Sequence, residues 1–81
     1  MKVTLRLFSI AKELAGFEER EVEVSPDAKA SEVLDILSRL NPQFTGWRRS
    51  LRLAVNREYV PEGHPLRPGD EVAIIPPVSG G

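Results

Sequence analysis

The sequence predicts an α+β domain in which a sheet of four to five strands is covered on one face by one main helix. Short segments near both ends of the chain alternate apolar with polar residues, as half-buried strands do. Between them, one segment repeats its apolar residues at helical spacing. The 81 residues contain no repeat, linker or low-complexity stretch, so we expect a single domain.

The first part of the chain is expected to form two strands and a short helix. Alternation of valine and leucine with polar residues predicts a strand over residues 2–8. Ser9 is a typical N-cap for a short helix over residues 10–15, and Gly16 ends that helix. Alternating glutamate and valine then predict a second strand over residues 21–24.

The main helix is predicted over residues 31–40. Its apolar residues form one stripe, which we expect to face the sheet: Val33, Leu34, Ile36, Leu37 and Leu40. Ser25-Pro26-Asp27 breaks the chain before this helix, and Asn41-Pro42 ends it. Residues 44–50 are expected to be a connector with room for one helical turn.

The remaining strands are predicted in the last third of the chain. Apolar residues alternate over residues 51–56, and a turn at 56–58 returns the chain into a short strand at 59–60. Arg67-Pro68-Gly69-Asp70 is typical of a type II turn, in which glycine takes the positive φ. The last strand follows over residues 71–75.

Two strands break the expected pattern at their last residue. A sheet covered on one face should be polar on the other, yet Phe8 and Ile75 both fall on the polar side of their strands. An apolar patch on a polar face is typical of a partner surface. The alternatives are a slip of register at the strand ends, or a short helix that covers Phe8.

Composition excludes several classes of function. The chain has no cysteine and a single histidine, His64, which excludes thiolate metal sites, histidine-pair metal sites and a Ser-His-Asp triad within one chain. A net charge of −1 predicts binding neither to nucleic acid nor to a membrane surface, and the cluster of Arg48, Arg49 and Arg52 is interpreted as ordinary surface. We expect a cytoplasmic protein without a signal peptide.

The C-terminal residues, Pro76-Pro77-Val78-Ser79-Gly80-Gly81, offer the one reactive group that we identify. A terminal carboxyl with a pKa of about 3.3–3.7 is an anion at neutral pH, able to attack the α-phosphate of ATP. The resulting mixed anhydride presents a carbonyl that a sulfur nucleophile can attack, and glycine leaves that carbonyl unhindered. The prolines hold the exit extended. The alternative is that a final Gly-Gly is an accident of composition.

Taken together, the residues resemble the small, sulfur-carrying subunit of molybdopterin synthase (the MoaD family). The resemblance covers the full length, in matching segments that begin with a first strand ending in Phe8 and continue through Lys12-Glu13-Leu14-Ala15-Gly16, Ala54-Val55-Asn56, His64-Pro65-Leu66, Gly69-Asp70-Glu71-Val72-Ala73 and the C-terminal residues. It implies a ubiquitin-like β-grasp domain with a mixed sheet over residues 1–75 and an extended tail over residues 76–81.

The resemblance also implies a sulfur cycle. A ubiquitin-activating-type adenylating enzyme would use Mg-ATP to adenylate Gly81, and a sulfurtransferase would help convert it to a thiocarboxylate. The tail, residues Pro76, Pro77, Val78, Ser79 and Gly80, would insert into the large subunit of a heterotetramer, where sulfur passes to cyclic pyranopterin monophosphate. The chain itself would bind no cofactor or metal and would have no activity alone.

For the partner interface, the resemblance implies Phe8, Lys12, Tyr59 and Ile75, with the first and last strands parallel and adjacent. The sequence departs from the family at Ile75, where an aromatic residue is common, at Lys12, where arginine is common, and at Ser79, where threonine is frequent. These departures bear on the partner contacts and leave the tail chemistry unchanged.

Three other interpretations remain open. A carrier of the same chemistry could serve thiamine synthesis, tRNA thiolation or protein conjugation. A non-carrier β-grasp module would bind partners without using its final glycines. A stand-alone enzyme ranks last among these interpretations, because the sequence offers no candidate pair of a nucleophile and a base.

Overall fold

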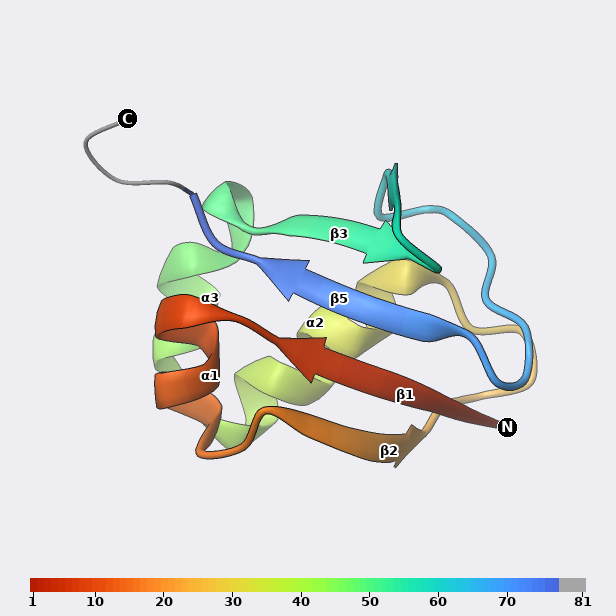
Figure 1. The fold of residues 1–81 in the computed structure, drawn as a ribbon, viewed down its shortest axis with the longest axis horizontal. Helices are drawn as coiled ribbons and strands as arrows, with labels where there is room; N and C mark the ends of the chain where they lie inside the picture. Colours follow the sequence, from red (N-terminus) through yellow and green to blue (C-terminus); the bar gives the residue numbers. More distant parts are fainter. Residues whose placement is uncertain (78–81) are drawn as a thin grey trace.

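The structure, a computed structural model, describes residues 1–77. Five strands, three α-helices and one 3₁₀ turn follow one another in these residues (Figure 1): β1 (Lys2–Leu7), α1 (Ser9–Ala15), β2 (Glu19–Glu23), α2 (Ala30–Leu40), α3 (Gln43–Trp47), η1 (Arg48–Ser50), β3 (Arg52–Val55), β4 (Glu58–Val60) and β5 (Glu71–Ile75).

The five strands form one mixed sheet in the order β2-β1-β5-β3-β4. The central strands β1 and β5 are parallel, while the other neighbouring pairs are antiparallel. The helices lie behind the sheet in Figure 1, and no helix of residues 1–77 lies over its other face. This order, with the last strand inserted beside the first and a helix crossing between two hairpins, is the predicted ubiquitin-like β-grasp.

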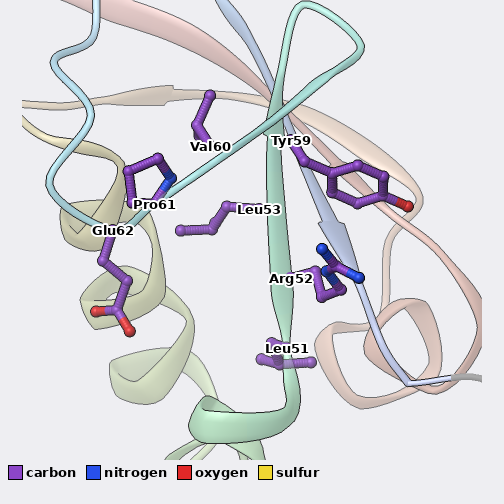
Figure 2. Close-up of a pocket in the computed structure, with 7 residues that line it drawn as sticks. All are labelled: Leu51, Arg52, Leu53, Tyr59, Val60, Pro61 and Glu62. Carbon is purple, nitrogen blue, oxygen red and sulfur yellow. The ribbon is translucent and has the colours of Figure 1, made fainter.

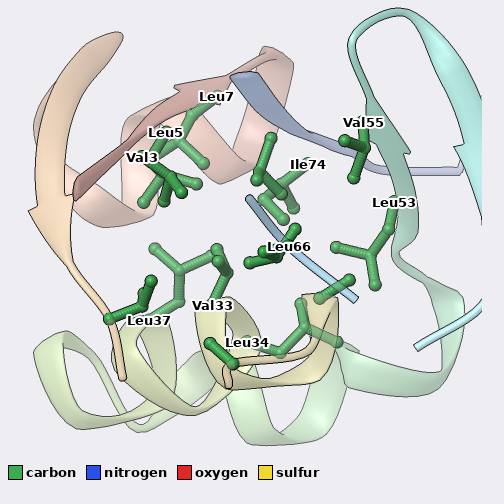
Figure 3. Packing of buried hydrophobic residues seen from close by; sticks show 14 of the residues in the cluster. Val3, Leu5, Leu7, Val33, Leu34, Leu37, Leu53, Val55, Leu66 and Ile74 are labelled. Atoms are coloured by element: carbon green, nitrogen blue, oxygen red, sulfur yellow. The ribbon is translucent and has the colours of Figure 1, made fainter. Parts of the chain in front are cut away.

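The core lies between the sheet and the helices, as Figure 3 shows for the sheet residues and for Val33, Leu34 and Leu37 of α2. Each strand of the central pair places alternate side chains there, and all are at most 1% exposed: Val3, Leu5, Leu7, Val72 and Ile74. No polar or charged residue of the described part is buried. The alternation therefore assigns the two sheet faces as the sequence predicted.

The first strand is one residue shorter than predicted. It ends at Leu7, and Phe8 is the extended residue that precedes α1, with φ −128° and ψ 151°. Ser9 does not cap the helix through its side chain: it begins the helix with φ 54°. Gly16 ends α1 with φ 84°, as predicted, because glycine adopts the left-handed region without steric cost. The second strand is shifted to Glu19–Glu23, two residues before the predicted start.

The predicted stripe of the main helix is correct except at its end. Leu40 is 50% exposed, because α2 ends there and no described element covers that position. The predicted connector is also more regular than expected, since it forms α3 and η1. Phe44 of α3 is 1% exposed and is therefore a core residue. Its spacing of three from Trp47 was the available helical signal.

Both predicted turns are present. Asn56 and Arg57 join β3 to β4 with φ values of 51° and 73°, the signature of a type I′ hairpin turn. Gly69 has φ 83° in the turn before β5. Asp70 connects the two turns, because it accepts hydrogen bonds from the Asn56 side chain at 3.0 Å and from the Arg67 backbone at 2.8 Å.

Candidate functional site

One row of register partners crosses all five strands on the uncovered face of the sheet. Arg6 of β1 lies between Glu19 of β2 and Ala73 of β5, Ala73 pairs with Ala54 of β3, and Ala54 pairs with Tyr59 of β4. Two small residues therefore occupy the middle of the row, with long side chains on both sides. We call this row, together with the residues that line the hollow above it, the open face.

The alanine pair forms the floor of a hollow of about 250 Å³ on the open face. It is lined by Arg6, Phe8, Ala54, Arg57, Tyr59, Glu71, Ala73 and Ile75. Three of the four residues predicted for a partner interface thus meet at one place: Phe8, Tyr59 and Ile75. Phe8 is 41% and Tyr59 60% exposed. Neither alternative to an exposed Phe8, a slipped register or coverage by α1, is what the structure contains.

The fourth predicted residue, Lys12, does not line this hollow. It lies in α1, where its ammonium group is 3.9 Å from Glu18 Oε2. The open face therefore consists of β-strand residues, Phe8 and the turn residue Arg57. Lys12 is a separate, exposed position on the helix that follows β1.

Arginine side chains lie over both aromatic rings of the open face. The Arg6 guanidinium is 5.6 Å from the centre of the Phe8 ring, and that of Arg52 is 4.5 Å from the centre of the Tyr59 ring. Such cation–π contacts hold the rings in place and shield part of their apolar surface from water. Figure 2 shows Arg52 and Tyr59 together on one side of β3.

Arg6 has most of its charge compensated within the open face. Its guanidinium lies 3.4 Å from Glu19 Oε1 and 3.5 Å from Glu71 Oε1, so it bridges β2 and β5. The Arg6 Nε group makes no hydrogen bond with another described residue, although Glu19 lies within ion-pair distance. Arg52 and Arg57 form no ion pair with any carboxylate of the described residues.

The chain leaves the open face at Ile75, the last residue of β5. Pro76 is buried and Pro77 is exposed. The other predicted tail residues, Val78, Ser79, Gly80 and Gly81, lie outside the described residues, and so does the carboxyl group that carries the predicted chemistry. The open face is thus directly followed in sequence by the predicted reactive segment.

A second hollow, of about 420 Å³, lies beside β4 and is drawn in Figure 2. Its lining residues are Leu51, Arg52, Leu53, Tyr59, Val60, Pro61 and Glu62, which include no serine, threonine, cysteine, lysine or histidine. Within residues 1–77, no three histidine, cysteine or acidic residues are grouped as metal ligands. No helix in the same residues has the length and hydropathy that crossing a membrane requires.

Sequence reasoning missed the alanine pair and the arginines of the open face. The signal was present, because the alternation in β3 and β5 places Ala54 and Ala73 on the polar side, where alanine is uncommon in strands. What the sequence could not supply was the register, which sets these two residues opposite each other.

Comparison with known proteins gives consistent matches over the full length. Residues 5–81 match the model of the ThiS family. The molybdopterin synthase sulfur carrier subunit of Chlamydomonas reinhardtii is 34% identical, with all of both chains aligned. The human protein of the same name is 32% identical over 99% of this chain and 94% of its own length.

The similarity to solved structures also extends over the full length of the chain. SAMP1 from Haloferax volcanii superimposes with a TM-score of 0.84 at 30% identity. A chain from the complex of subunits 1 and 2 of molybdopterin-converting factor from Helicobacter pylori superimposes with a TM-score of 0.71 at 28% identity, and each match covers 100% of both chains. A ubiquitin from Caldiarchaeum subterraneum, with a TM-score of 0.65 and 18% identity over 100% of this chain and 98% of its own, shows the fold alone.

Proposed function

This chain belongs to the ThiS family, and from that premise we propose that it is the sulfur-carrying small subunit of a molybdopterin synthase. The observation that carries the proposal is the end-to-end similarity to sulfur carrier subunits of that enzyme from an alga and from human. The exposed aromatic and aliphatic residues next to the start of the tail support the proposal, because a carrier must be bound by other proteins.

The proposed chemistry takes place at Gly81. Its carboxylate attacks the α-phosphorus of ATP in an adenylating enzyme, which forms an acyl-adenylate and releases pyrophosphate. Sulfur at the oxidation level of sulfide, supplied through a sulfurtransferase, then attacks the acyl carbonyl and displaces AMP. The product is a thiocarboxylate. ATP and Mg²⁺ belong to the activating partner, and we place this cycle in the cytoplasm, where ATP is available.

The large synthase subunit is the proposed site of sulfur transfer. The tail, from Pro76 to Gly80, threads into it so that the thiocarboxylate reaches cyclic pyranopterin monophosphate. Each carrier delivers one sulfur atom and the dithiolene product needs two, so carriers must exchange or act in turn at the ends of a heterotetramer. Phe8, Tyr59 and Ile75 make the main apolar contacts, and Lys12 adds a charged contact at the edge.

The test is a reconstitution from purified components. The chain is loaded to the thiocarboxylate, checked by intact mass for oxygen replaced by sulfur, and mixed with the large subunit and cyclic pyranopterin monophosphate. Formation of the dithiolene, followed by mass spectrometry, is the expected result. A loaded chain that binds the large subunit but yields no dithiolene contradicts the proposal.

A second candidate is a ubiquitin-like protein modifier, favoured by the similarity to SAMP1, a small archaeal modifier protein. It uses the same acyl-adenylate but passes the Gly81 carbonyl to a lysine amine. Mass spectrometry of lysines joined by an isopeptide bond to the C-terminal peptide of this chain, in the native host, separates it from the first proposal. Carriers for thiamine synthesis or tRNA thiolation, and a module without carrier activity, predict no dithiolene in the reconstitution.

A further inference from the structure

The alanine pair of the open face is buried although no helix or strand of residues 1–77 lies over it. Ala54 is 5% and Ala73 8% exposed, yet neither belongs to the core cluster on the helix side. Their burial comes from the longer residues around them, with Arg6 and Tyr59 on either side of the pair in the row and Phe8 and Ile75 beside it. The floor is therefore apolar, narrow and recessed.

The charges around this hollow are unevenly compensated. Arg6 is paired with Glu19 and Glu71. Arg57 lines the hollow and Arg52 stacks on its Tyr59 wall, and neither pairs with a carboxylate of residues 1–77. The β3–β4 side of the hollow therefore presents two positive charges that an acidic partner surface would complement.

We propose that the hollow over Ala54 and Ala73 receives one apolar side chain of the large synthase subunit, and that a carboxylate beside that side chain pairs with Arg52 and Arg57. This inference rests on the proposed function and states the chemistry of the partner surface. A cavity of about 150 Å³ is large enough to hold benzene. The 250 Å³ hollow therefore has room for a leucine, methionine or phenylalanine side chain.

The position of the hollow also fits this occupant. Ile75 forms part of its wall and is followed directly by Pro76 and the tail. A partner side chain bound in the hollow would contact the end of β5, the strand that the tail follows, and would therefore fix the position from which the tail enters the partner. Buried apolar anchors in pockets are typical of the residues that dominate binding energy.

The first experiment fills the hollow. Ala54→Leu and Ala73→Leu place a side chain where the partner's would lie, and Thr4→Leu is the matched control, because Thr4 is on the same sheet face but does not line the hollow. Calorimetric titration with the large subunit is expected to show binding weakened about tenfold or more for both alanine variants and nearly unchanged for the control. Thermal melts establish that each variant is folded.

The second experiment removes the two charges. The double variant Arg52→Gln/Arg57→Gln is expected to associate more slowly and with a weaker dependence on salt. Arg39→Gln/Arg49→Gln is the control, since it removes the same net charge from exposed positions in α2 and η1. Equal effects in the two double variants would mean that only net charge matters, which overturns the carboxylate part of the proposal.

The contact itself is read by nuclear magnetic resonance. With ¹³C-methyl alanine in this chain, the Ala54 and Ala73 methyl groups are expected to show intermolecular NOEs to aliphatic or aromatic protons of the large subunit. If the chain binds and these NOEs are absent, or the filled variants bind as tightly as the natural chain, the inference fails while the proposed function stands. If the natural chain does not bind the large subunit, both fail.

Discussion

Leu7 and Ile74 are the last register pair of the parallel strands β1 and β5, and both side chains are buried against the helices. Because successive residues of a strand point to opposite faces, the residues that follow them, Phe8 and Ile75, emerge on the open face. Both line the same hollow. One parallel pair thus explains both breaks in the sequence pattern and places them where the chain enters its tail.

Phe8→Ala is expected to weaken binding to the large subunit about tenfold or more while leaving the fold intact. Phe8 is exposed, so its removal takes contact area from an interface and opens no core cavity. Leu40→Ala is the matched control, because Leu40 is equally apolar and exposed but lies at the end of α2. Calorimetry with both variants makes the comparison, and equal losses would contradict the role of the open face.

Arg48→Gln is expected to lower the free energy of unfolding by about 0.5–1 kcal/mol. The Arg48 guanidinium binds Asp35 of α2 at 2.6 Å and Glu62 in the segment after β4 at 3.2 Å. The hydrogen bond to Asp35 is the main cause of its raised pKa. Urea unfolding at low and high salt measures the effect, which should shrink as salt rises. Arg49→Gln, next in sequence and exposed, should change little.

The contribution of Glu32 to stability should depend on pH. Its carboxylate accepts hydrogen bonds from the Ser25 hydroxyl at 2.7 Å and from the Ser25 backbone at 2.9 Å, which lower its pKa below the ordinary value of 4.5. A lowered folded-state pKa stabilises the protein above pH 4.5, and this stabilisation is lost as pH falls through the folded-state value.

Glu32→Gln should therefore melt at a lower temperature than the natural chain at pH 7. The difference should diminish as the pH falls below 4.5, measured by thermal melts across that range. Glu13→Gln is the control, because Glu13 has no ion pair among the described residues. A difference in melting temperature that is independent of pH would show that the carboxylate charge is not its source.

Arg57→Gly is expected to stabilise the fold by about 0.5–1 kcal/mol, because Arg57 has φ 73° in the hairpin turn and glycine adopts that conformation without strain. Glu58→Gly, one residue later in β4, should destabilise by a similar amount, since glycine weakens a strand. Urea unfolding of both variants measures the two effects. A destabilised Arg57→Gly protein would indicate that the arginine side chain contributes more than the strained turn costs.

The fold was predicted best where the local sequence pattern is strongest. The strand β5 has the predicted bounds, because a proline-glycine turn precedes it and two prolines follow. Phe44 was missed as a core residue, because the spacing of three between Phe44 and Trp47 is a weak local signal and the burial of Phe44 depends on how the short helix α3 packs against α2. Leu40 was wrongly predicted to lie in the core, because helical periodicity does not show where the packing of α2 against the rest of the protein ends.

The site was predictable to the level of single positions but not of their partners. The alternation of apolar and polar residues alone identified Phe8 and Ile75 as residues on the polar face of the sheet. The family resemblance added Tyr59 to the predicted interface. The hollow required the pairing of Ala54 with Ala73, which depends on how β5 inserts between β1 and β3. Lys12 was grouped with these residues, yet the structure places it on α1, outside the hollow.

The central claim is that the Gly81 carboxyl carries sulfur to the pterin. The most direct test loads the chain with isotopically labelled sulfur and measures its intact mass before and after incubation with the large subunit and cyclic pyranopterin monophosphate. We predict that the label leaves the chain, which returns to the carboxylate mass, and appears in the dithiolene. Label that stays on the chain, or that is released without entering the pterin, would contradict the claim.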